Sequence, residues 1–342
     1  MRRAGVLTGG GDSPGINAAI RAIVRFGYKQ EVETIGFLEG WKGPLDNLTR
    51  PLKVDDVSGI LHIGGTILGS SRTNPFKIEG GVERILSTLK HNAIDFLIGI
   101  GGDDTLGVVH RLSERGVKAI GIPQTIDNDI SMTDYSIGFA SALAVVTDAL
   151  DRLHTTAFSH HRVLILEVMG RDSGWLSLLG GIAGGADVII IPEQEFSVEE
   201  VHKKILRRQA RKKHFSIIII AEGAKPVGWE GQIVSETKVD AFGHVRLGGV
   251  GQYLANQLSE QMKIPLRVTN LAYLQRGGSP TPFDRILATR FGAAAIEFAL
   301  DGRFDVMTAL HGTKIEPVSL EEALSAPRPV DPGLRYLLTL FE

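Results

Sequence analysis

Cysteine is absent from the 342 residues of this sequence. Without it the chain can form no disulfide, no thiolate nucleophile and no cysteine metal site. An excess of charge of one sign is also missing, because 37 lysine and arginine residues face 39 aspartate and glutamate residues and leave a net charge of −2. A balance this even gives no sign of a nucleic-acid partner or of a membrane partner.

Long apolar runs are lacking as well. No stretch of the sequence is long enough to cross a bilayer, and the start at Met1–Thr8 does not have the form of a signal peptide. We therefore expect a cytoplasmic protein. Glycine, by contrast, is abundant at 41 residues, which fits an architecture with many tight turns between strands and helices.

Short apolar strands alternate with amphipathic helices, and the chain is too long for one small core. We expect an α/β fold of two doubly wound domains with mainly parallel sheets and an active site in the cleft between them. The predicted strands are Val6–Thr8, Asp95–Ile100, Lys118–Pro123, Val163–Met169, Val188–Ile191 and Phe215–Ala221. The predicted helices are Ile16–Tyr28, Leu106–Glu114, Ile137–Thr155 and Val198–Lys213.

Two segments break this alternation. Residues 223–249 are rich in glycine and alternate polar with apolar residues, which predicts a β-hairpin or arm inserted in the second domain. The segment Ala326–Pro332 contains three prolines, and we expect this tail to wrap around the surface.

Four loops follow predicted strands, and ligand-binding residues of parallel sheets collect at such carboxyl ends. They are Gly9–Gly15, Gly101–Thr105, Thr125–Asp129 and Met169–Arg171. The loop Gly101–Thr105 has the glycines of a phosphate-binding turn, but it carries Asp103 and Asp104 and no lysine. Carboxylates repel phosphate unless a divalent metal lies between them, so this loop predicts a Mg²⁺–phosphate complex.

The other three loops each allow two interpretations. Asp127 and Asp129 can divide the tasks of base and metal ligand in phosphoryl transfer, or they can belong to a solvated Asx-rich turn. The triple glycine at Gly9–Gly11 can approach a phosphate or simply form a tight turn. Arg171 can neutralise a transferring phosphoryl group or pair with a surface carboxylate. Single arginines in polar loops suit a sugar phosphate only if several converge: Arg72, Arg162, Arg267 and Arg276.

With these loops in this order, the chain resembles the 6-phosphofructokinases over nearly its whole length. The resemblance is carried by Gly-Gly-Asp at 101–103, Thr-Ile-Asp-Asn-Asp at 125–129, Met-Gly-Arg at 169–171 and Gln-Arg-Gly-Gly-Ser-Pro at 275–280. It implies transfer of a phosphoryl group to the C1 hydroxyl of fructose 6-phosphate, with Mg²⁺ as cofactor. More remote alternatives are a non-catalytic sugar-phosphate sensor and an enzyme similar to NAD or lipid kinases.

The resemblance also implies a role for each matching residue. Asp127 corresponds to the general base, and Gly11, Arg72, Thr125 and Arg171 correspond to groups around the transferring phosphoryl. The residues that correspond to the binding site of the sugar phosphate are Arg162, Met169, Gly170, Glu222, Arg267, Tyr273 and Arg276. The residues that correspond to the donor site are Gly11, Arg72, Gly102, Asp103, Asp104, Thr105 and Gln124. Asp103 and Asp129 correspond to the ligands of Mg²⁺.

Two positions bear on the phosphoryl donor. Members of the family that use ATP usually have glycine at position 104, and members that use pyrophosphate resemble this chain in having aspartate. Pyrophosphate users, however, usually have lysine where this chain has Gln124. Because a buried like charge can forbid binding while a lost attraction only weakens it, Asp104 favours pyrophosphate, and ATP stays the alternative.

The resemblance further implies shared active sites and a division into domains. Arg162 and Arg267 match residues that reach a neighbouring subunit, so we expect a homodimer or homotetramer. The larger, donor-binding domain is expected at 1–138 with 276–325, and the smaller, sugar-binding domain at 139–275 with 326–342. An allosteric effector site is only half matched, and we expect weak or absent control; the matching residues are Arg21, Arg25, Asp187, Arg211 and Lys213, while Val54 and His154 stand where arginines are expected.

Overall fold

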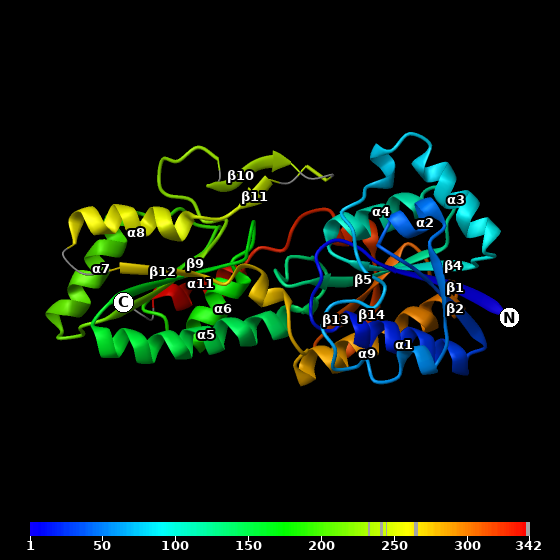
Figure 1. Ribbon diagram of the computed structural model, residues 1–342, viewed down its shortest axis with the longest axis horizontal. Helices are drawn as coiled ribbons and strands as arrows, with labels where there is room; N and C mark the ends of the chain where they lie inside the picture. Colours follow the sequence, from blue (N-terminus) through cyan, green and yellow to red (C-terminus); the bar gives the residue numbers. More distant parts are fainter. Residues whose placement is uncertain (232, 240–241, 244, 263–265, 340–342) are drawn as a thin grey trace.

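The computed structural model describes residues 1–231, 233–239, 242–243, 245–262 and 266–339 (Figure 1). Two separate sheets, each with helices on both faces, account for most of this chain. The predicted α/β architecture with mainly parallel sheets is thereby confirmed. In the described part of the chain no helix is long and apolar enough to span a membrane.

The larger sheet has the strand order β14-β13-β5-β4-β1-β2-β3, and the short strand β6 pairs with β5. Its pairings are parallel from β13 to β2, and the two edge strands β14 and β3 are antiparallel. The strands are β1 (Arg2–Thr8), β2 (Val32–Phe37), β3 (Thr49–Leu52), β4 (Phe96–Gly101), β5 (Ala119–Thr125), β6 (Ile137–Gly138), β13 (Val306–His311) and β14 (Lys314–Ser319).

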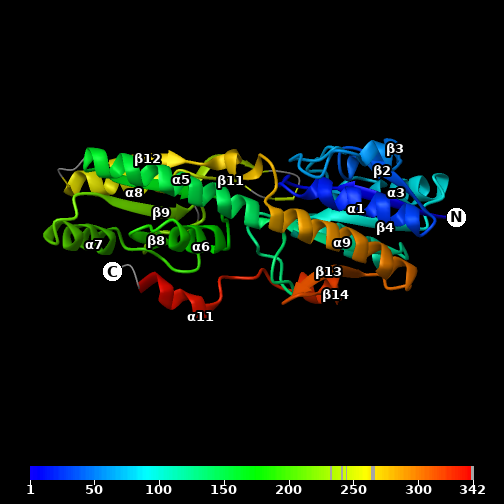
Figure 2. The ribbon, with the colours of Figure 1, turned by 90° about the horizontal axis from the view of Figure 1, so that it is seen from below.

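Successive side chains of each strand point to opposite faces of this sheet, and each face packs into its own apolar core. In β4, Phe96, Ile98 and Ile100 pack with helices α1 (Ile16–Lys29) and α9 (Pro282–Leu300). Leu97 points to the opposite face, where it packs with α4 (Asp103–Ser113) and α3 (Gly81–His91). The helices therefore lie on both faces of the sheet, as Figures 1 and 2 show. The short helices α2 (Lys42–Asp46) and α10 (Leu320–Ala323) and the turns η1 (Asp55–Val57) and η2 (Pro75–Lys77) complete this part.

The smaller sheet is all parallel, in the order β12-β7-β9-β8. Its strands are β7 (Val163–Val168), β8 (Val188–Ile190), β9 (Ser216–Ala221) and β12 (Leu266–Asn270). In β9, Ile217 and Ile219 pack towards the first pair of flanking helices and Ile218 and Ile220 towards the second pair. The first pair is α5 (Phe139–His160) and α6 (Trp175–Ala183), and the second is α7 (Val198–Ala210) and α8 (Val250–Gln261).

The prediction for the arm was correct, whereas the prediction for the tail was incomplete. The predicted hairpin is confirmed, because β10 (Val234–Val239) and β11 (Val245–Leu247) pair antiparallel; residues 232, 240–241 and 244 of the arm lie outside the described residues. The tail runs past both sheets to α11 (Pro332–Arg335) and η4 (Tyr336–Thr339) (Figure 2). It does more than wrap the surface, since Val330 is fully buried in the core beside α6.

Two predicted boundaries near the loops of interest were wrong. Helix α4 begins at Asp103, three residues earlier than expected, so Asp103 and Asp104 lie in its first turn, where acidic side chains interact favourably with the helix dipole. Strand β5 continues through Gln124 to Thr125 because its last residues pair with β6. The larger sheet draws strands from both ends of the chain, and the exact domain boundaries remain a prediction.

A buried carboxylate joins the helices at the junction of the two sheets. Asp284, in the first turn of α9, is fully buried and accepts hydrogen bonds from Gly138 N at 3.0 Å and Ser141 N at 2.7 Å, at the start of α5. The Ser141 hydroxyl donates to the same carboxylate at 2.6 Å. Burial raises the pKa of Asp284, while these three hydrogen bonds oppose that shift. The Asp284 side chain, which comes from another helix, therefore accepts hydrogen bonds from backbone amides at the N-terminus of α5 that have no partner within α5.

We predict that Asp284→Asn destabilises the protein by about 2–3 kcal/mol, because the new amide group faces backbone donors that then have no charged acceptor. Urea titration of the free energy of unfolding measures this. Asp301→Asn, at the opposite end of the same helix, is the control, since its side chain is 57% exposed. Equal stability of the two variants would contradict the role of Asp284.

Candidate active site

The glycine loop after β1 forms one wall of a pocket of about 460 Å³. A Cβ atom added at Gly11 would lie 2.3 Å from Arg276 Nη1, so a larger residue would displace the guanidinium from this position. Arg276 comes from the turn η3 (Ala272–Arg276), which follows the smaller sheet, and Nη1 donates to Asp12 O at 3.4 Å. The pocket thus has walls from both sheets; its lining residues are Gly10, Gly11, Asp12, Thr66, Ser70, Arg72, Tyr273 and Arg276.

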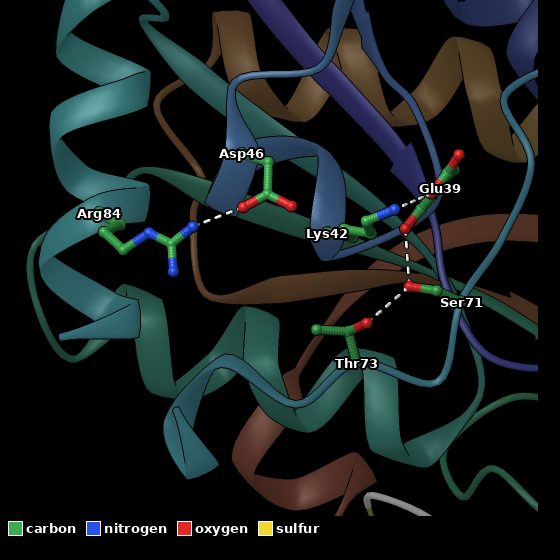
Figure 3. Close-up of polar contacts among 6 residues, drawn as sticks. All are labelled: Glu39, Lys42, Asp46, Ser71, Thr73 and Arg84. Atoms are coloured by element: carbon green, nitrogen blue, oxygen red, sulfur yellow. Dashed lines mark hydrogen bonds and ion pairs between the residues drawn. The ribbon is translucent and has the colours of Figure 1, made fainter. Parts of the chain in front are cut away.

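Arg72 reaches this pocket from a loop that is fixed on both sides. Ser70 Oγ donates to Gly10 O at 2.6 Å, which ties the loop to the glycine turn. Ser71 Oγ donates to Glu39 O at 2.7 Å and lies 2.9 Å from Thr73 Oγ1 (Figure 3). Figure 3 also shows that the segment receiving this bond is itself held by ion pairs, Lys42 with Glu39 and Arg84 with Asp46. The two serines therefore place Arg72 at the edge of the pocket.

The first turn of α4 brings two carboxylates beside the glycine loop. Asp103 is exposed and Asp104 is half-buried. Thr105 is 1% exposed, and its side chain fills the space above Gly9 and Gly101. Thr105 thus holds the two loops together by packing.

Gln124 is also turned into the protein. Its side chain is 1% exposed, and Nε2 donates to Ser13 Oγ at 2.8 Å. Ser13 in turn donates to Ile137 O at 3.2 Å. The amide of Gln124 therefore links the end of β5 to the glycine loop.

The loop after β5 holds Asp127 and Asp129 through its own hydrogen bonds. Asp127 N donates to Thr125 Oγ1 at 3.2 Å. Between the two aspartates, Asn128 adopts a left-handed conformation with φ of 52°, and its Oδ1 accepts from Ser136 N at 2.9 Å. Asparagine tolerates this conformation better than most residues do. The turn at Asn128 therefore allows both flanking carboxylates to approach the same side of the loop.

Electrostatics make these carboxylates unusual. Burial raises the pKa of Asp127; Arg276 and Arg171 oppose the shift, and Asp103 and Asp172 add to it. For Asp129, burial together with repulsion from Asp127 and Asp103 raises the pKa to about 8. Charged aspartates in such a place need a nearby cation, and perturbed carboxylates of this kind are typical of functional sites.

The site fits a magnesium ion. Asp127 Oδ1 is shielded from solvent and finds no hydrogen-bond partner within the described part of the chain. Carboxylate oxygens are the ligands that Mg²⁺ prefers, and it usually takes one or two of them together with substrate phosphates and water. No group of three or more acidic or histidine side chains suited to hold a metal occurs among the described residues, so phosphate oxygens would have to complete the coordination.

Residues at the carboxyl ends of the neighbouring strands β7 and β9 approach the carboxylates from the smaller sheet. Gly170 has φ of 136°, and its carbonyl accepts from Gly223 N at 3.0 Å. Met169 N donates at 3.2 Å to Oε1 of the fully buried Gln275. Burial and repulsion from Asp127 raise the pKa of Glu222 to about 7, and Arg171 opposes them. These residues therefore face the same carboxylate cluster from the other sheet.

Two predicted sugar-phosphate residues lie elsewhere. Arg162 precedes β7 and Arg267 lies near the start of β12, next to Leu164 in the parallel register. Met169 and Gly170 follow the other end of β7, at least seven residues from Arg162, which at the rise of a strand is about 23 Å. A single chain therefore does not bring Arg162 and Arg267 together with the pocket.

The candidate effector residues also divide into two groups. Asp187 forms an ion pair with Arg208 at 2.8 Å and accepts from Ile217 N at 2.8 Å, and burial raises its pKa although Lys213 lies near enough to oppose the shift. Arg211 caps the end of α7 in the same region. Arg21 and Arg25 belong to α1 on the larger sheet, and Figure 1 shows α1 and α7 at opposite ends of the molecule. One chain does not assemble these five residues.

Several residues of the pocket were given no individual role from sequence. Asp12, in the predicted loop Gly9–Gly15, lines it with Thr66 and Ser70, and Gln275, from the family motif, supports it from the core. Ser70 stands in the polar run before Arg72, which offered a usable signal. Thr66 carried none, because its place depends on a hydroxyl contact of 2.9 Å with Thr8 that only folding creates.

Comparison with known proteins agrees with this geometry. A pyrophosphate–fructose 6-phosphate 1-phosphotransferase of Amycolatopsis mediterranei is 52% identical over 98% of this chain and 97% of its own length. An ATP-dependent 6-phosphofructokinase 3 of Streptomyces coelicolor is 47% identical over 98% of each. The solved phosphofructokinase of Saccharomyces cerevisiae superposes with a TM-score of 0.81 at 30% identity, and this chain covers about half, 47%, of that longer one. The family model described as Phosphofructokinase matches residues 3–299, and the chain therefore belongs to the phosphofructokinase family.

Proposed function

We propose that this chain transfers a phosphoryl group from pyrophosphate to the C1 hydroxyl of fructose 6-phosphate, giving fructose 1,6-bisphosphate. The observation that carries the proposal is the position of Asp127. This aspartate has a raised pKa and a shielded oxygen without a partner in the described chain, and it lies between Arg171, Arg276 and the acidic first turn of α4. A base so placed suits a hydroxyl that must lose its proton as it attacks phosphorus.

The surrounding residues supply orientation and charge. Asp127 accepts the proton of the attacking hydroxyl, and Thr125 holds the loop through the Asp127 amide. Arg72 and Arg171 neutralise the transferring phosphoryl, and the backbone of Gly11 approaches it closely. Mg²⁺, held by Asp103 and Asp129, would offset the charge of the phosphates. On the sugar side, Met169, Gly170, Glu222, Tyr273 and Arg276 bind fructose 6-phosphate.

Asp104 favours pyrophosphate as the donor. Its side chain adds bulk and negative charge to the first turn of α4, where an ATP user needs room for a nucleotide phosphate. Gln124 lacks the charge of the lysine that pyrophosphate users usually have, but this counts only weakly against pyrophosphate. Its buried amide bonds to Ser13 and so acts on the donor through the glycine loop. Relatives named as pyrophosphate enzymes reach 52% and 50% identity.

ATP is the second candidate donor, since relatives named as ATP-dependent enzymes reach 47% and 46% identity. A non-catalytic sugar-phosphate sensor would not need the base, yet Asp127 is present. An enzyme similar to NAD or lipid kinases would leave the Thr125–Asp129 and Gln275–Pro280 motifs unexplained. A cytoplasmic location remains part of the proposal.

The proposed assembly is a homodimer or homotetramer with shared active sites. Arg162 and Arg267 lie at the end of the smaller sheet away from the pocket. From there they can complete the sugar-phosphate site of a second copy. The same assembly would bring Arg21 and Arg25 of one subunit towards Asp187, Arg211 and Lys213 of another, where we propose at most weak effector binding.

Parallel assays with Mg²⁺ and fructose 6-phosphate test the donor. We expect turnover with pyrophosphate to exceed turnover with ATP by about 100-fold or more, because a like charge in a partly buried site costs several kcal/mol. Asp104→Gly should raise kcat/KM for ATP, and Asp95→Asn, at the opposite end of β4, is the control that should not. An unchanged preference in Asp104→Gly would show that Asp104 does not select the donor, and activity with neither donor would refute the proposed function.

Asp127→Asn tests the base. We expect kcat to fall by about 10³-fold, because a positioned base contributes two to four orders of magnitude, while fructose 6-phosphate still binds. Calorimetric binding and steady-state rates measure the two effects separately. Asp151→Asn, on the exposed side of α5, should behave as the wild type. Near-normal turnover of Asp127→Asn would rule out its assignment as base.

Mixed oligomers test the shared site. Asp127→Asn and Arg162→Ala should each be nearly inactive, but co-expression should restore activity, because one site of a mixed pair keeps both native residues. Tagged, co-purified hetero-oligomers provide the measurement. Pairing Asp127→Asn with Arg171→Ala is the control. Each chain supplies both of these residues to its own site, so every site of the mixed oligomer carries one of the two changes and no native site can form. Absence of recovery in the first pair would contradict sharing through Arg162.

A further inference from the structure

Residues 324–331, here called the C-terminal strap, cross the loop that carries Asp127 and Asp129. This segment follows the part of the chain matched by the family model, residues 3–299. It leaves α10, passes below both sheets and continues into α11 (Figure 2). A tail in such a place can influence the loop only through specific contacts, and the structure contains several.

Arg328 binds both arms of the loop. Its backbone N–H donates to Asp129 O at 2.6 Å, and its guanidinium Nη1 donates to Asp134 O at 2.7 Å. Asp134 O also accepts from the Asn128 side chain at 3.2 Å. The strap therefore bonds two carbonyls that lie five positions apart and both follow the turn at Asn128: Asp129 O through the Arg328 backbone and Asp134 O through the guanidinium.

The strap is itself firmly placed. The guanidinium of Arg328 stacks on the Trp175 ring at 4.7 Å, a cation–π contact that suits the planar group of arginine. Ser131 Oγ donates to Ala326 O at 2.7 Å. Val330 is buried beside α6, and its N–H donates to Glu193 Oε1 at 2.8 Å. These contacts fix Arg328 before any ligand arrives.

The remaining contacts of the loop do not replace Arg328. Ser173 Oγ donates to Asp127 O at 3.3 Å, and Gly312 N donates to the Asp134 carboxylate at 2.7 Å. Asp134 N also donates to Leu310 O at 2.8 Å, so these bonds hold the loop at Asp127 and Asp134, whereas the Arg328 amide binds the carbonyl of Asp129.

We propose that Arg328 is a positioning residue for the catalytic loop, and that the C-terminal strap holds Asp127 and Asp129 in the geometry that phosphoryl transfer needs. The inference rests on the proposed function of these two aspartates. Displacement of reacting groups by about 1 Å can lower turnover by about 100-fold, so a residue that touches no substrate can still control the rate.

Arg328→Ala, Arg328→Lys and the control Arg335→Ala test the proposal. Arg335 lies in the same tail and lines a separate pocket with Val188 and Phe196. In metal-free protein we expect Arg328→Ala to increase hydrogen exchange about 10-fold in peptides covering 127–136, while peptides of α9 stay unchanged. In assays kcat should fall about 10-fold and the half-saturating Mg²⁺ concentration should rise about 10-fold, as for other residues that orient metal ligands, with KM for fructose 6-phosphate within about twofold.

The three variants should rank in a fixed order. Arg328→Lys can still donate to Asp134 O but loses the planar stacking, so its effects should fall between those of the wild type and Arg328→Ala. Arg335→Ala should match the wild type. If Arg328→Ala folds poorly, Ser131→Ala, which removes a single exposed bond to the strap, should shift exchange and kcat about two- to threefold in the same direction.

Two results would overturn the inference. One is unchanged exchange and unchanged kcat in Arg328→Ala. The other is a loss of active protein with wild-type Mg²⁺ dependence, which is what a purely structural arginine would give. Wild-type inactivity with both donors would instead refute the proposed function, and the exchange experiment would still decide whether the strap holds the loop.

Discussion

Three carboxylates in one partly buried cluster are the constraint on which the rest of this structure depends. Asp103, Asp127 and Asp129 lie near enough to repel one another, and burial of Asp127 and Asp129 makes their charged forms costly. A fold keeps such a cluster only if cations and hydrogen bonds offset it. Arg171 and Arg276 provide charge from the second sheet, and the loop carbonyls are bound by Ser173 and by the tail.

The two sheets must therefore meet closely, and steric features of the chain make this possible. A Cβ atom at Gly223 would lie 1.8 Å from Arg171 O, so the end of β9 can pass the arginine loop only as glycine. Gly11 likewise leaves space for Arg276. At the junction, Asp284 of α9 binds the start of α5. Close packing and a satisfied buried carboxylate fix the relative positions of groups that come from distant parts of the sequence.

Sequence patterns predicted the strands and helices that lie beside the ligand loops, because buried parallel strands are short apolar runs bounded by glycine. They missed the strands β2, β3, β12, β13 and β14 and the helices α3, α6, α8 and α9. They also placed the start of α4 too late, because glycine and aspartate suggest a turn, while the helix dipole favours aspartate in the first turn. The buried place of Gln124 depends on Ser13, 111 residues away in the chain, and could not be foreseen.

The order of the residues was enough to predict the chemistry: the residue types at Gly101–Asp104, Thr125–Asp129 and Met169–Arg171 are those that metal-assisted phosphoryl transfer requires, and the order of these motifs identified the family. The geometry of the site depended on folding. Folding set Arg276 over Gly11, moved Arg162 and Arg267 away from the pocket of their own chain and laid Arg328 across the catalytic loop. The physical reason is that motifs encode local backbone and reactivity, whereas charge pairing and packing between distant segments arise only when the sheets come together.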